Sequence, residues 1–149
     1  MIITFIGHRS VIGVPDLDDR IQNAILQNLS ANEPIYFYCG GYGEFDRRCA
    51  IIAQKCKACH PQSETVFITP YLTLQQQKKI NEYLAVGLYD CVLYPPLENT
   101  PPKYAIVKRN EWMIAQADVV IAYVNQTFGG AYRSLQYAKR KNKRIINLA

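Results

Sequence analysis

Long apolar segments are absent from this sequence of 149 residues. No stretch reaches the roughly 18 consecutive apolar residues that a membrane-spanning helix requires, so we expect no membrane partner. The opening residues, MIITFIGHRS, also lack the basic leader, the longer apolar run and the small-residue cleavage site of a secretory signal. We therefore expect a cytoplasmic protein.

Charged residues are scarce as well, at 19% of the chain, whereas hydrophobic residues make up 49%. This balance excludes an intrinsically disordered chain and predicts a globular fold. The length suits one domain with its own core, so we assign residues 1–149 to a single domain. The five cysteines are odd in number, and in a reducing compartment we expect them to be free thiols.

A complete metal-binding or haem-binding pattern is also missing. The segment CKACH at residues 56–60 matches the C-x-x-C-H pattern of covalent haem attachment, but that chemistry belongs to exported proteins. Its cysteines fall on the apolar stripe of a predicted helix, where cysteine behaves as a small apolar residue. We therefore expect Cys49, Cys56 and Cys59 to be buried thiols, and we predict no metal site and no cofactor.

Short apolar runs alternate with helix-period stretches along the whole chain, which predicts an α/β fold with a mostly parallel sheet and helices on both faces. The expected strands are residues 2–6, 34–39, 65–69, 91–94, 118–124 and 144–148. The expected helices are residues 16–30, 44–59, 74–88, 103–117 and 129–142. Asp16 is the expected N-cap of the first helix. The unbroken apolar run VVIAYV, residues 119–124, predicts a central strand that is buried on both faces.

Three glycine-containing loops each follow a predicted strand: residues 7–9, residues 40–43, and residues 125–130. In open α/β sheets, ligands bind at the carboxyl ends of the strands. Glycine lets the backbone approach a ligand, and the N–H groups of a following helix favour an anion. We therefore predict one phosphate-binding site whose loop residues are Gly7, His8, Arg9, Gly40, Gly41, Gly43, Gly129 and Gly130.

Polar side chains on the predicted helices extend this site. The Arg109 guanidinium can clamp a phosphate, and the Asn110 amide can hydrogen-bond to a base or ribose edge. An exposed pair on a solvated helix face is the alternative for these two residues. Ser134 can donate its hydroxyl to a phosphate or bond back into its own helix. We include all three among the predicted ligand-binding residues.

The order of FIGHR, CGGYGEFDRRCA, KRNEWMIAQADVVIAYV and FGGAYRSLQYAKRKNKRIINL resembles the SLOG superfamily, and most closely its YpsA-like branch. The resemblance extends from Ile2 to Leu148. It implies a Rossmann-like sheet with a nucleotide site built from the glycine loops. The superfamily includes the Lonely Guy phosphoribohydrolases and the DNA-processing protein DprA. Relatives often dimerise, which makes a homodimer one candidate assembly.

The chain departs from the Lonely Guy motif PGGxGTxxE. The matching residues 128–136 read FGGAYRSLQ, with Gln136 in place of the glutamate. Glutamine cannot act as a carboxylate base, so the hydrolase mechanism does not carry over to this helix. The catalytic residues stay unknown, with Glu44 and Asp46 as candidates and Glu44 also a candidate ligand contact. Acidic residues in a first helical turn are equally explained by the helix dipole.

We expect the protein to bind a nucleotide or an ADP-ribose-like molecule as a sensor or regulator. A ribosyl-bond hydrolase or transferase is the first alternative. Nucleic-acid binding is the second, because basic residues crowd the C-terminus, namely Lys139, Arg140, Lys141, Lys143 and Arg144. A solvated helix end explains the same charges, and no nucleic-acid-binding motif accompanies them, so nucleic acid is not the favoured partner.

Overall fold

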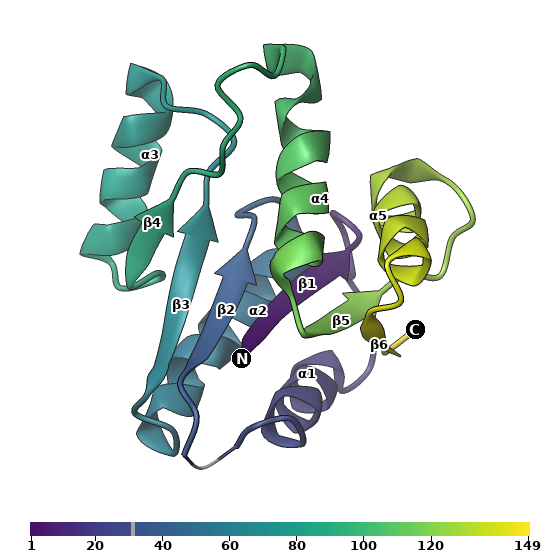
Figure 1. Ribbon diagram of the computed structural model, residues 1–149. Helices are drawn as coiled ribbons and strands as arrows, with labels where there is room; N and C mark the ends of the chain where they lie inside the picture. Colours follow the sequence, from purple (N-terminus) through teal and green to yellow (C-terminus); the bar gives the residue numbers. More distant parts are fainter. Residues whose placement is uncertain (31) are drawn as a thin grey trace.

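The computed structural model describes residues 1–30 and 32–149, in which a six-stranded sheet lies between helices (Figure 1). All strand pairs are parallel, in the order β4-β3-β2-β1-β5-β6. The strands are β1 (Ile2–Gly7), β2 (Ile35–Cys39), β3 (Ser63–Ile68), β4 (Cys91–Leu93), β5 (Val119–Tyr123) and β6 (Arg144–Asn147). The predicted Rossmann-like α/β fold is confirmed.

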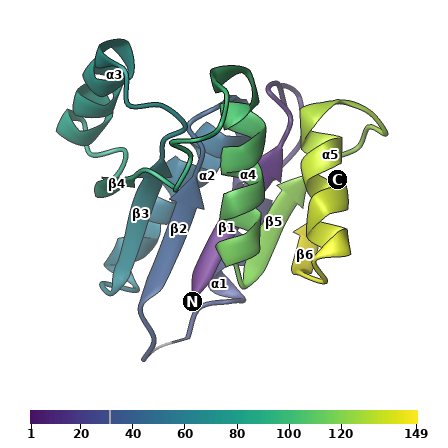
Figure 2. The same cartoon turned by 45° about the horizontal axis from the view of Figure 1, so that its top comes forward.

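Helices cover both faces of the sheet, as the sequence predicts (Figures 1 and 2). On one face lie α1 (Leu17–Leu26) and α2 (Glu44–Lys55), and on the other lie α4 (Ala105–Gln116) and α5 (Gly129–Arg140). The remaining helix, α3 (Leu74–Ala85), flanks the β3–β4 edge. Within residues 1–30 and 32–149, none of these helices has the length and apolar character to cross a membrane.

Strand β5 shows why the sheet needs helices on both faces. Ile121 faces the core beneath α1 and α2, whereas Val120 and Ala122 face the core beneath α4 and α5. All three residues are completely buried. The expectation of a central, doubly covered strand at VVIAYV is therefore confirmed.

The order of the strands creates a crevice. From β1 the chain builds outward through β2, β3 and β4, then returns to the other side of β1 to add β5 and β6. The loops after β1 and β5 consequently leave the sheet toward opposite faces, and the space between them is open to a ligand.

One helix-end prediction is confirmed and one is wrong. Asp16 is the N-cap residue of α1, as expected, although it adopts the left-handed conformation, at φ 53°, and its side chain accepts no capping hydrogen bond. Side-chain capping requires an extended N-cap residue. The α2 helix ends at Lys55 and continues as the 3-10 turn η1 (Cys56–Ala58), so Cys59 is exposed instead of buried. All five cysteines are free, as expected.

Candidate functional site

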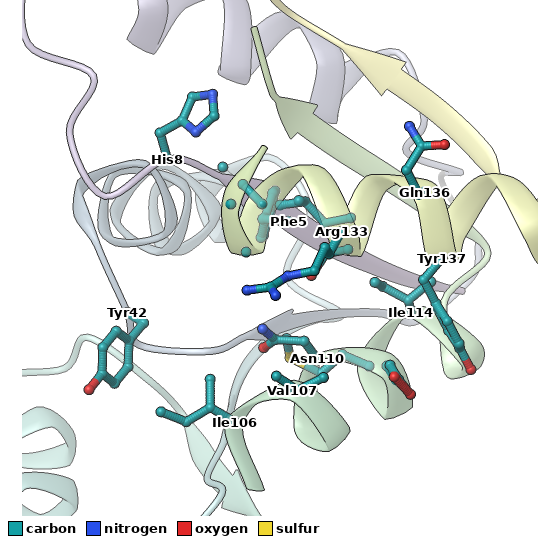
Figure 3. Close-up of a pocket in the computed structure, with 18 of the residues that line it drawn as sticks. Phe5, His8, Tyr42, Ile106, Val107, Asn110, Ile114, Arg133, Gln136 and Tyr137 are labelled. Atoms are coloured by element: carbon teal, nitrogen blue, oxygen red, sulfur yellow. The ribbon is translucent and has the colours of Figure 1, made fainter. Parts of the chain in front are cut away.

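A cavity of about 820 Å³ opens at the crevice between β1 and β5 (Figure 3). We call it the large cavity. One wall is the end of β1 with the loop that follows it, and α4 and α5 form the others. Of the predicted ligand-binding residues, it brings together Gly7, His8, Arg9, Arg109, Asn110, Gly129, Gly130 and Ser134.

The N-terminus of α5 opens directly onto the large cavity. Its N-cap residue, Phe128, provides no side-chain hydrogen bond to the first turn. Gly129 has φ 91°, and a Cβ atom at Gly129 or Gly130 would meet no atom within 4 Å. The first turn of this 12-residue helix therefore lines the cavity without a side-chain cap, and helix N–H groups of this kind favour an anion.

Besides Arg109, three arginines line the large cavity: Arg9, Arg133 and Arg140. None of them forms an ion pair with a carboxylate among the described residues. The Arg9 guanidinium lies 5.5 Å from the centre of the Tyr42 ring, and that of Arg140 lies 5.7 Å from the centre of the Tyr137 ring. Their positive charge is therefore available to a ligand.

Arg109 is directed into the protein. Its side chain is only 1% exposed, and Nη1 donates to the main-chain oxygens of Gly40 and Ile68, each at 2.7 Å. Its Nε donates to the Asn110 Oδ1 at 2.9 Å. The alternative of an exposed pair on a solvated face is therefore wrong for Arg109, and its role as a phosphate clamp stays a prediction.

Asn110 completes the wall formed by α4. Because its Oδ1 accepts from Arg109, its amide nitrogen is left as a donor toward the large cavity. In Figure 3 the Arg133 side chain extends from α5 toward α4, on which Asn110 lies. The two helices thus present a cation and a neutral donor to the same space.

The loop at residues 40–43 reaches the same edge of the sheet but borders a different space. Gly40 and Gly41 line a second, smaller cavity of about 190 Å³, and only Tyr42 lines both cavities. Gly43 has φ 87°, and a Cβ atom there would lie 2.9 Å from the Arg9 Cα. This close approach holds the loop against the residues that follow β1. The single pocket predicted for all three glycine loops is therefore two adjoining cavities.

The candidate catalytic carboxylates are both engaged by other groups. Glu44 lines neither cavity, because Oε2 accepts from the Val11 N–H at 2.8 Å and Oε1 from the Arg48 Nη2 at 3.0 Å. Asp46 is buried and lines the large cavity, where it accepts from the Gly40 N–H at 3.1 Å and the Gly41 N–H at 2.7 Å. Burial raises the pKa of the Asp46 carboxyl, although these hydrogen bonds oppose the shift. Both carboxylates are thus hydrogen-bonded within the protein, and a catalytic role for either stays a prediction.

His8 and Gln136 stand at two further points of the large cavity. The His8 Nε2 accepts from the Asn125 N–H at 3.1 Å, which links the loop after β1 to the loop after β5. Gln136 projects from a different side of α5 than Arg133 does (Figure 3). Among the described residues, no three histidine, cysteine or acidic side chains gather closely enough to hold a metal ion.

Residue-by-residue reasoning missed Arg133, Tyr137 and Arg140, which line the large cavity from α5. The signal was present in the sequence. Starting from Gly130, these residues follow at intervals of three or four, which places them on one face of a helix. A ligand at the N-terminus of α5 would therefore also meet the helix face that carries these residues.

Comparisons with known proteins identify the fold. No family model and no curated protein match the chain. The chain is similar to a solved structure of DNA processing protein A from Helicobacter pylori, which is described for its single-stranded DNA binding mode. The two sequences are 21% identical, the TM-score is 0.61, and the match covers 97% of this chain and 63% of that one. DprA from Streptococcus pneumoniae is 14% identical with a TM-score of 0.61, covering 96% and 48%. The chain thus spans under two thirds of either protein and shares their fold, whereas the YpsA-like branch stays a prediction.

Proposed function

We propose that the large cavity binds the phosphate of a nucleotide or nucleotide-derived ligand, in a sensory or regulatory role. One observation carries this proposal: Arg9, Arg133 and Arg140, which form no ion pair with a carboxylate of the described residues, line the same cavity as a helix N-terminus without a side-chain cap. Guanidinium groups and helix N–H groups both select phosphate oxygens. Binding an anion there would supply acceptors to donors that have none among the described residues.

The rest of the cavity suits a nucleoside. Its volume of about 820 Å³ lies within the range of about 300–1,000 Å³ that is typical of small-molecule sites. The Tyr42 and Tyr137 rings supply aromatic surface, and the Asn110 amide supplies a neutral donor. A phosphate at α5 and a base on the aromatic residues would use both parts of the cavity.

Calorimetric titration tests the proposal with AMP, ADP-ribose and NAD, and with adenosine as the ligand that lacks phosphate. We expect the phosphorylated ligands to bind and adenosine to bind at least about tenfold more weakly, the difference of about 1.4 kcal/mol that one charge-assisted contact supplies. Equal affinity for AMP and adenosine would reject a phosphate site. Release of free base in the same samples would support the ribosyl-bond alternative.

A matched pair of variants locates the phosphate. Arg133→Ala removes a cation that lines the large cavity, whereas Lys139→Ala removes an exposed cation of the same helix that does not. We expect a loss of affinity of about tenfold for the first variant and of less than about twofold for the second. Equal losses would mean that overall charge, and not a contact with Arg133, drives binding.

Single-stranded nucleic acid is a second candidate ligand. It is supported by the fold shared with DNA processing protein A, whose Helicobacter pylori structure is described for single-stranded DNA binding. The basic residues Lys139, Arg140, Lys141 and Arg144 are exposed, and Arg140 also lines the large cavity. Lys143 differs from them, because its Nζ donates to the main-chain oxygens of Ala115 and Ala117, each at 2.9 Å.

The salt dependence of binding to an oligo-dT strand of about 15 nucleotides tests this candidate. If Lys141 contacts a phosphate, Lys141→Ala should reduce the slope of log affinity against log salt concentration by about 0.7. Lys78→Ala, which removes an exposed cation of α3, should leave the slope unchanged. Nucleotide binding without any oligo-dT binding would reject this candidate and keep the first.

A further inference from the structure

The second cavity has its own chemical character. It lies at the ends of β2 and β3 and at the start of α3, and Phe67, Tyr71 and Tyr83 give it aromatic walls. Its polar side chains include Gln75 and Gln76. Among the described residues, no carboxylate lines it, and Lys79 is its one cation. Aromatic walls with amide groups suit a nucleobase better than a phosphate.

Its donors and acceptors are only partly used within the protein. The Gln76 Nε2 donates to the Thr69 Oγ1 at 3.1 Å, which leaves the Gln76 Oε1 as an acceptor. Gln75 and Lys79 are exposed at the rim, and neither side chain makes a hydrogen bond within the described chain. A nucleobase bound in the second cavity could therefore form hydrogen bonds with these groups through the edge of its ring.

The size of the second cavity limits what it can hold. At about 190 Å³ it falls below the range of about 300–1,000 Å³ that is typical of complete ligand sites. It adjoins the large cavity, and Tyr42 lines both. Tyr42 is 53% exposed, so its ring is open to contact from a ligand (Figure 3). A small cavity beside a larger one is the expected form of a subsite for one end of a longer ligand.

We infer that the second cavity receives the second base of a ligand in which two nucleotide units are joined through phosphate. The first unit lies in the large cavity with a phosphate at the α5 N-terminus, and the ligand passes Tyr42 on its way to α3. This inference rests on the proposed function, because the first unit is the proposed nucleotide. Both a free dinucleotide and a single strand have this chemistry.

Paired titrations test the inference and separate the two sources. NAD is compared with AMP, and the 5′-phosphorylated dinucleotide pdTpdT with dTMP. Stacking and hydrogen bonding of a second base should make at least one two-unit ligand bind about fivefold to a hundredfold more tightly than its one-unit counterpart. An advantage for NAD alone identifies a free dinucleotide, and an advantage for pdTpdT identifies a strand.

The double variant Gln75→Ala/Lys79→Ala then assigns that advantage to the second cavity. Both side chains are exposed, so the fold tolerates their loss. We expect the ratio of two-unit to one-unit affinity to fall toward one, while Lys78→Ala on the same helix leaves the ratio as it is. A ratio of one in the unaltered protein, or a ratio that the double variant does not change, overturns the inference. Failure of every nucleotide to bind instead overturns the proposed function.

Discussion

Arg109 and Asp46 hold Gly40 by its two main-chain groups. The Arg109 Nη1 donates to the Gly40 oxygen at 2.7 Å, and the Asp46 Oδ1 accepts from the Gly40 N–H at 3.1 Å. Burial lowers the pKa of the Arg109 guanidinium, and the nearby Asp46 carboxylate opposes that shift. Because Gly40 is the first residue of the loop at residues 40–43, which separates the two cavities, this buried pair fixes the wall between them.

Replacing Arg109 with methionine should lower the free energy of unfolding by about 3–5 kcal/mol. The change leaves the oxygens of Gly40 and Ile68 without their donor and Asp46 without its cation, all in the interior. Urea denaturation measures the loss. Arg133→Met is the control, since Arg133 is exposed and should change stability by less than about 0.5 kcal/mol. Similar values for the two variants would show that Arg109 is not a structural residue.

Helix α4 shows how much of the environment of Arg109 could be predicted from the sequence. The buried residues Ala105, Arg109 and Met113 follow one another at intervals of four, so an arginine stands in the apolar stripe of the helix. This spacing indicates burial, but it does not reveal the acceptors. Gly40, which follows β2, and Ile68, which ends β3, lie 69 and 41 residues away from Arg109 in the sequence. Such partners are fixed by the tertiary structure, which local patterns do not encode.

The fold itself was predictable because its signals are local. Apolar strands, helix periodicity and glycines at strand ends predicted the parallel sheet and the edge at which the loops meet. Helix ends were less predictable, as Cys59 shows. The apolar periodicity that runs through Cys59 is compatible with a longer helix. In the structure, α2 ends at Lys55 because the next turn has 3-10 geometry, which the periodicity does not reveal. Tyr42 lines both cavities, and their division depends on the tertiary position of its loop, which the sequence pattern does not contain.

Gly41→Ala should destabilise the fold by about 2–4 kcal/mol. Gly41 has φ 72°, a conformation that costs other residues about 1–2 kcal/mol, and a Cβ atom there would overlap the Phe67 ring. Gly13→Ala provides the control, because Gly13 has φ 78° but a Cβ atom there would meet nothing within 4 Å. Chemical denaturation of both variants separates the backbone cost from the clash. A loss no larger at Gly41 than at Gly13 would contradict the tight packing at Phe67.

Asp90→Asn should remove a pH-dependent part of the stability. Burial by itself would raise the pKa of Asp90, but hydrogen bonds from the Lys57 ammonium and the Thr65 N–H outweigh it and lower the pKa. A carboxyl whose pKa is lower in the folded state stabilises the fold above its unfolded pKa of about 3.9. That contribution is lost as the pH falls through the folded pKa.

We therefore expect the free energy of unfolding of the unaltered protein to be about 1 kcal/mol higher than that of Asp90→Asn at pH 7. This difference should shrink below about pH 4. Urea denaturation at several pH values measures it. Glu98→Gln is the control, because Glu98 is exposed and forms no ion pair within the described chain. A difference that stays constant from neutral to acidic pH would mean that the Asp90 charge contributes nothing.

Alkylation of the native protein with iodoacetamide should label Cys59 first. Cys59 is exposed, whereas Cys39 and Cys49 are completely buried and burial raises the pKa of both thiols. Burial also raises the pKa of Cys56 to about 11, and that of the half-buried Cys91 above its usual range, so few of their thiols ionise at neutral pH. Peptide mass spectrometry after short reaction times identifies the labelled residue, and Cys59→Ser should abolish the fast phase. Labelling of Cys39 or Cys49 at the rate of Cys59, without denaturant, would show that the core beneath α2 opens readily and would contradict the packing described above.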